Sequence, residues 1–185
     1  MDVWIAKALI EMAQYDLQVR EELLQAGKLS AGYNSDMERV HQKHAARLEE
    51  IINTIGYPTR LKVGTEASDA AWLIVQHAIG APALIKKCYA MLLEATDAVN
   101  PQNLAYLHDR ICYFEGRPQK YGTQFDNRGL YPVEDKAEMI RLRKELGLSP
   151  HPEDSIVECR AEDCKTDLHP DDEEFNLRRK KVGWI

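Results

Sequence analysis

Apolar side chains recur every three or four positions along most of the first 115 residues, a spacing typical of helices that bury one face. Such stretches occupy 2–26, 35–55, 68–79, 82–96 and 101–114, and a shorter one occupies 135–146. Alternation with period two, which would indicate strands, is not sustained anywhere. The pattern predicts an all-α fold of five to six helices, with a connector over 57–67 and a loop over 116–132.

End signals support these boundaries. Ser35 and Glu38 form a capping box at the start of the second stretch, and Gly56 closes it. Asn100-Pro101 opens the fifth stretch in the manner of an N-cap followed by proline. We therefore predict a single helical domain over 1–150.

The composition changes beyond Pro150. Residues 151–185 contain an acidic block, a basic block and little apolar periodicity, so we predict an irregular C-terminal extension. Phe175 and Trp184 are its candidate anchors, either against the same chain or in a homodimer. A disordered, solvated end is the alternative.

The net charge, the apolar runs and the cysteine positions limit which partners and which compartment are expected for this protein. The 185 residues carry a formal net charge of −6, which argues against nucleic-acid binding. The longest apolar run is far shorter than a membrane span, and Met1-Asp2-Val3-Trp4 does not open a signal peptide. Two of the four cysteines lie in apolar helical stretches, as buried thiols do. We expect a cytoplasmic protein that binds a small-molecule ligand.

Polar side chains gather at two places in the predicted helical domain. Gln76 and His77 interrupt an otherwise apolar helix, and residues 105–124 combine apolar positions with many hydrogen-bonding groups. Groups of this kind are costly to bury without partners. The helices are therefore expected to surround a polar pocket.

The order of these motifs resembles a bacterial family of domains of unknown function. The resemblance covers about 16–148 and rests on Asp16 and Arg20, Gly56-Tyr57-Pro58-Thr59, Val63-Gly64, Ala71-Trp72 with Gln76-His77-Ala78, Ala105-Tyr106-Leu107 with Asp109-Arg110, and Gln119-Lys120-Tyr121-Gly122-Thr123-Gln124. It implies a shared fold and pocket but no reaction. His41 and His44 stand where the family pattern has an Asp and an Asn, so an activity common to the family can be altered here.

His77 is the leading candidate for a catalytic group, because imidazole titrates near neutral pH and can act as general acid or base. Asp109 would orient it. The alternatives are a core histidine that packs without chemistry, and an Asp109 that pairs with a cation of a neighbouring helix.

Arginines and amides supply candidate substrate contacts. Arg20 and Arg110 can bind a carboxylate or phosphate bidentately, while Gln76, Gln119, Tyr121, Thr123 and Gln124 would position the substrate. Three ordinary structural roles compete: ion pairs between helices, an Asp16–Arg20 pair one helical turn apart, and capping of helix ends by the amides.

A metal site is a further hypothesis. Glu38, His41 and His44 recur at intervals of three on one side of a helix, and His77 and Asp16 would complete a mixed set for zinc, iron or manganese. The second Glu-x-x-His of a di-metal bundle is absent from the sequence. Cys159, Cys164 and His169 form a weaker set.

No nucleotide-cofactor motif and no serine-nucleophile elbow occurs in the sequence, and Cys112 has only His108 as a candidate activating neighbour. Three hypotheses stay open. The first is an acid–base enzyme centred on His77 that acts on a small polar or anionic metabolite. The second is a metal-dependent enzyme, so the class is hydrolase, lyase or metal-dependent oxidoreductase. The third is a non-catalytic protein that binds a ligand or partner.

Overall fold

The computed structural model describes residues 2–29, 34–95, 98–160 and 173–185. Its contacts divide the chain into two compact units, Met1–Val99 and Asn100–Ile185, and each is described by itself. The prediction of an all-α protein is confirmed, since helices dominate both units and the sheet has only two short strands. None of the described helices is long and apolar enough to cross a membrane.

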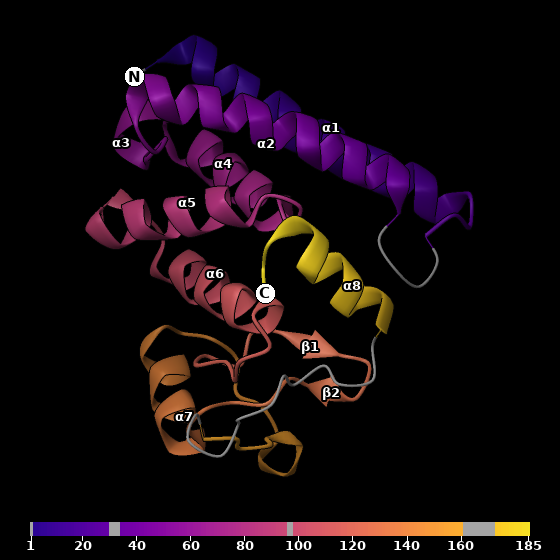
Figure 1. Cartoon of the computed structure of the whole chain (residues 1–185). Helices are drawn as coiled ribbons and strands as arrows, with labels where there is room; N and C mark the ends of the chain where they lie inside the picture. Colours follow the sequence, from indigo (N-terminus) through magenta and orange to yellow (C-terminus); the bar gives the residue numbers. More distant parts are fainter. Residues whose placement is uncertain (1, 30–33, 96–97, 161–172) are drawn as a thin grey trace. The chain divides into compact units, whose positions relative to one another are not determined.

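The described residues of the first unit form the α-helices α1 (Val3–Gln25), α2 (Ser35–Ile55), α3 (Arg60–Val63), α4 (Thr65–His77) and α5 (Pro82–Glu94). Helices α1 and α2 lie side by side, and α4 packs against both (Figure 1). The core between them is built from the predicted apolar stripes, including Leu9, Leu48 and Ile74.

Helix α3 lies where the sequence predicted a connector. Gly64, with φ of 86°, separates it from α4, and this left-handed conformation favours glycine. Helix α4 then begins at Thr65, three residues before the predicted start. A helix of one turn is too short to show apolar periodicity, so the pattern could not reveal it.

The second unit contains α6 (Pro101–Phe114), a hairpin of β1 (Phe125–Asp126) and β2 (Gly129–Leu130), α7 (Lys136–Glu145), a 3-10 turn (Glu153–Ser155) and α8 (Glu173–Val182). Leu130, Val133, Met139 and Ile156 form a buried apolar cluster. The hairpin was not predicted, because strands of two residues leave no alternating pattern.

Helix α8 packs against the end of α6. Trp184 stacks on Phe114 with ring centroids 5.0 Å apart, and Phe175 lies 5.5 Å from the same ring. Buried Arg179 donates to the Phe114 carbonyl at 3.0 Å, where a helix end leaves carbonyls unsatisfied. The C-terminal residues therefore pack through both predicted anchors against their own unit, which is why the contacts do not separate 151–185 from the rest.

We expect Trp184→Ala to destabilise the second unit by about 3–5 kcal/mol, because it removes a large buried ring and leaves a cavity on Phe114. Urea unfolding followed by circular dichroism measures the change. Leu177→Ala is the matched control, since Leu177 lies on α8, shortly before Trp184 in the chain, with 62% of its surface exposed. Equal stability of the two variants would show that the stacking of Trp184 on Phe114 does not stabilise the fold.

Candidate functional site

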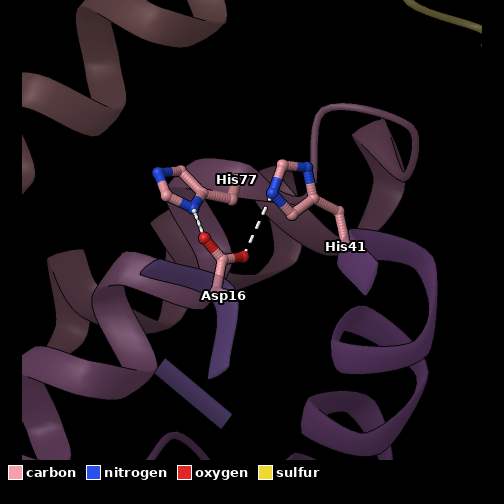
Figure 2. Close-up of side chains that lie close together, drawn as sticks. All are labelled: Asp16, His41 and His77. Carbon is pink, nitrogen blue, oxygen red and sulfur yellow. Dashed lines mark hydrogen bonds and ion pairs between the residues drawn. The ribbon is translucent and has the colours of Figure 1, made fainter. Parts of the chain in front are cut away.

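Asp16 of α1 is the centre of a polar cluster inside the first unit. It is only 1% exposed, and three histidines surround its carboxylate. His77 Nδ1 lies 2.8 Å from Asp16 Oδ1, and His41 Nε2 lies 3.0 Å from Oδ2, so the two imidazoles face the two oxygens (Figure 2). The Nδ1 atom of His44 lies 4.0 Å from Oδ2, beyond hydrogen-bonding distance.

Three helices bring these side chains together. Asp16 lies on the inward stripe of α1 with Leu9, Ala13 and Leu23. His41 and His44 are one turn apart on the buried side of α2. His77 is the last residue of α4, which packs against both of the other helices.

The histidines of the cluster keep the carboxyl group of Asp16 in its deprotonated, charged form. Burial alone would raise the pKa of this carboxyl, but hydrogen bonds and attraction from His41 and His77 outweigh burial and hold the pKa far below its usual range. Burial lowers the pKa of His44, and its attraction to Asp16 only partly opposes this effect. A neutral His44 keeps a lone pair on one ring nitrogen.

These donors have the types and spacing of a metal-binding set. Ligand atoms of Asp16, His41 and His77 all lie within 4.8 Å of one another. Two atoms bound to the same tetrahedral zinc at the usual bond lengths lie ~3.3 Å apart, so small side-chain shifts would suffice. Glu38 lies outside this group and accepts a hydrogen bond from Gln42.

A small hollow lies beside His41, which is the residue of the cluster that lines it. Its cavity volume is about 10 Å³, room for a group about as large as one water molecule. Glu38 and Gln42 supply its other polar groups, and the remaining wall consists of small residues, namely Ala45, Ala78, Gly80 and Ala81. The hollow gives a water molecule a place next to the imidazole of His41.

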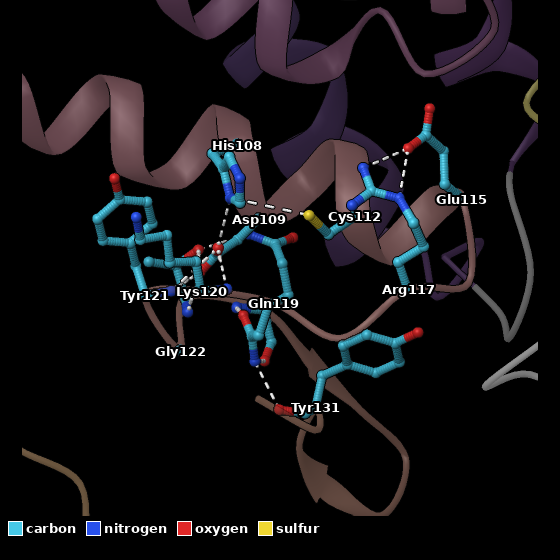
Figure 3. A network of polar contacts seen from close by, with 12 residues as sticks. His108, Asp109, Cys112, Glu115, Arg117, Gln119, Lys120, Tyr121, Gly122 and Tyr131 are labelled. Atoms are coloured by element: carbon cyan, nitrogen blue, oxygen red, sulfur yellow. Dashed lines mark hydrogen bonds and ion pairs between the residues drawn. The ribbon is translucent and has the colours of Figure 1, made fainter. Parts of the chain in front are cut away.

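Asp109 of α6 is the second fully buried carboxylate, and its role is structural. It accepts hydrogen bonds from the backbone N–H groups of Lys120, Tyr121 and Thr123 at 2.8–3.1 Å, and from the Thr123 hydroxyl at 3.1 Å (Figure 3). His108 Nδ1 lies 3.1 Å from the same carboxylate. Asp109 thus fastens the loop 119–124 to α6.

The amides of this loop also satisfy one another. Gln119 is fully buried, donates to the carbonyls of Gln124 and Tyr131, and accepts from the backbone N–H of Gln124. The Gln124 side chain donates to the Thr123 hydroxyl at 3.1 Å. These amides therefore bond to groups of the loop and of Tyr131, and not to the helix ends that the structural alternative expected them to cap.

Two residues that the sequence analysis missed hold the loop from another side. Arg143 of α7 donates to the carbonyls of Tyr121 and Gly122 at 2.7 and 2.8 Å, and His151 Nε2 lies 2.7 Å from the Gly122 carbonyl oxygen. The only signal in the sequence was an arginine near the end of a short predicted helix, and such an arginine does not identify its own partner.

Two predicted pairings do not describe the structure. The acid beside His77 Nδ1 is Asp16, whereas Asp109 has its contacts with His108 and the loop. Among the described residues the partners of Asp16 are imidazoles, so the expected Asp16–Arg20 pair is not formed. A buried carboxylate on the inward face of α1 contacts α2 and α4, while Arg20 is exposed.

The remaining predicted site residues are each described within their own unit. Gln76 is buried next to His77 on α4, and Arg110 is half-buried on α6. Tyr121 is half-buried, and burial together with Asp109 raises the pKa of its hydroxyl. Of the weaker metal set, Cys164 and His169 lie outside the described residues, and Cys159 is disulfide-bonded.

Comparison with known families gives one match. The model of a family of unknown function, DUF6624, matches residues 4–163. The chain belongs to this family. No curated protein and no solved structure matches it. The DUF6624 match includes both buried carboxylates, Asp16 and Asp109, and ends before α8.

We expect Asp109→Asn to lower the free energy of unfolding of the second unit by roughly 2–4 kcal/mol, because an amide cannot accept all the N–H groups that the carboxylate satisfies. Urea unfolding gives the change, and faster hydrogen exchange at Lys120, Tyr121 and Thr123 locates it. Asp154→Asn, in the exposed 3-10 turn, should cost less than about 0.5 kcal/mol. Equal effects of the two substitutions would contradict a structural role for Asp109.

His108 gives a pH-dependent prediction. Burial would lower its pKa, but the hydrogen bonds to Asp109 and Cys112 raise the pKa from 6.5 to about 9. Because the folded-state pKa is the higher one, the stabilisation is complete below pH 6.5 and is lost as the pH rises through about 9.

The stability difference between wild type and His108→Gln, at most about 3 kcal/mol, should therefore be largest near pH 6 and shrink towards pH 10. Urea unfolding of both proteins across this range measures it, and NMR titration of the imidazole gives the folded-state pKa directly. A difference that is constant with pH would rule out the ion pair.

Proposed function

We propose that this protein is a metal-dependent enzyme whose centre binds one divalent cation through Asp16, His41 and His77. The observation that carries the proposal is the convergence of a buried carboxylate and two imidazoles, from three different helices, within 4.8 Å. His44, whose Nδ1 lies 4.0 Å from Asp16 Oδ2, lies outside this group of three donors. Nitrogen-rich sets of this kind suit zinc, iron or manganese.

The surroundings of the set support catalysis over a purely structural metal. Structural zinc sites fill all four positions with protein ligands, whereas catalytic sites keep one position open for water or substrate. The hollow beside His41 provides that space, and Glu38 supplies a carboxylate on its wall. A cation there would lower the pKa of bound water, which favours hydrolysis of a small metabolite.

A second candidate is acid–base catalysis by the Asp16–His77 pair without a metal. The 2.8 Å contact of Asp16 with Nδ1 would fix the ring of His77, whose side chain is 23% exposed. The other ring nitrogen points away from Asp16 (Figure 2). An imidazole held in this way by a carboxylate is a recurring general base.

Metal analysis separates the two candidates. Protein purified without chelator is expected to contain about one zinc, iron or manganese ion per chain, and Asp16→Asn or His41→Ala should weaken its affinity by at least about 100-fold, because each removes a direct ligand. Asp69→Asn is the matched control, since Asp69 is an exposed acid of the same unit. Mass-spectrometric elemental analysis and competition with a chromophoric chelator give both numbers.

Stability provides an independent measurement. A cation present at 100 times its dissociation constant stabilises the folded chain by about 2.7 kcal/mol, so chelator should lower the melting temperature of wild type and leave His41→Ala unchanged. Metal-free protein that melts identically with and without chelator would contradict the metal centre. Loss of turnover in His77→Ala alone, with His41→Ala active, would instead favour acid–base catalysis.

A further inference from the structure

A groove runs along the seam between the second half of α1 and the first half of α2. Its volume is about 530 Å³, within the range of small-molecule sites. Tyr15, Val19 and Val40 give it an apolar wall, and Lys28 and Lys43 stand among its charged residues. The groove belongs entirely to the first unit.

The two lysines are available to a ligand. The other charged residues of the groove have partners of their own, because Arg39 pairs with Asp36, and Glu22 accepts from Gln18. Within the described part of the chain, Lys28 and Lys43 have no ion-pair partner within 4 Å. Glu22 keeps its negative charge, so the two acids and three bases that line the groove leave one net positive charge beside an apolar wall.

One residue of the groove wall, Tyr15, contacts the cluster around Asp16. The Tyr15 ring forms part of its wall and meets the His44 ring edge-on, with centroids 6.1 Å apart. Tyr15 also directly precedes Asp16, and Val40 directly precedes His41. A ligand in the groove would thus contact Tyr15 and Val40, the residues that directly precede two members of the proposed centre.

We propose that this groove binds the substrate, and that the substrate is an apolar molecule with one anionic group, a carboxylate or a phosphate. The inference rests on the proposed function, since it names the substrate class of that centre. Lys28 and Lys43 hold the anionic group as point charges. Tyr15, Val19 and Val40 contact the apolar body and place it beside His44.

Two matched anions and one cation test the charge preference. Phenyl phosphate and benzoate share an apolar ring with benzylammonium but differ from it in charge. In nitrogen-15 NMR titrations of the full chain, at least one anion should give saturable shifts for amides over 15–26 and 36–43. Benzylammonium should give none there. The anion that binds more tightly identifies the group as phosphate or carboxylate.

Charge-removing variants test the two lysines. Lys28→Gln/Lys43→Gln should weaken binding of the preferred anion about 10-fold. Lys7→Gln/Lys144→Gln, which removes the same charge at exposed positions elsewhere, should change it less than about 2-fold. No saturable shift with either anion, equal binding of benzylammonium, or equal loss in both double variants would overturn the proposal.

The same titration in His41→Ala separates this proposal from the metal centre. Retained anion binding in a variant that has lost the cation would support the groove whatever the cation does. A wild-type protein that binds a cation but neither anion would overturn the groove alone and leave the metal centre standing.

Discussion

A carboxylate that is buried as an ion must be met by partners, because its desolvation costs several kcal/mol. Among the described residues, each unit contains one carboxylate that is at most 1% exposed, Asp16 in the first and Asp109 in the second. Much of the polar architecture follows from how these two charges are satisfied. Around Asp16, three helices converge. Around Asp109, a loop closes on α6.

The partners of the two carboxylates differ in what they can do. Backbone N–H groups, the Thr123 hydroxyl and one imidazole, that of His108, meet Asp109. Of these partners, only His108 can titrate near neutral pH or offer a lone pair to a cation. Imidazoles meet Asp16, and an imidazole can lose its proton and offer the lone pair to a metal. The loop is therefore suited to holding structure, and the cluster in the first unit is suited to chemistry.

The local sequence pattern was sufficient to predict the long helices and to select the side chains named in the metal hypothesis. The inward stripe of α1 includes Asp16, and the spacing of His41 and His44 places both on one side of α2. The local pattern could not predict which acid contacts His77. Asp16 lies 61 positions away in the sequence and meets His77 only because α1 packs on α4. Arg143 and His151 were missed for the same reason, because a side chain that binds backbone carbonyls leaves no pairwise signal in the sequence.

The same dependence on long-range packing explains why α8, beyond the part matched to DUF6624, still belongs to the second unit. Its Arg179 donates to the carbonyl of Phe114, the last residue of α6, while Trp184 covers the Phe114 ring. A cation at this position interacts favourably with the negative end of the helix dipole of α6 and restrains the last turn of that helix. Asp109 lies little more than one turn before the end of α6, and the loop that it binds begins soon after that end. Restraining the end of α6 therefore restrains both Asp109 and the loop that donates hydrogen bonds to it.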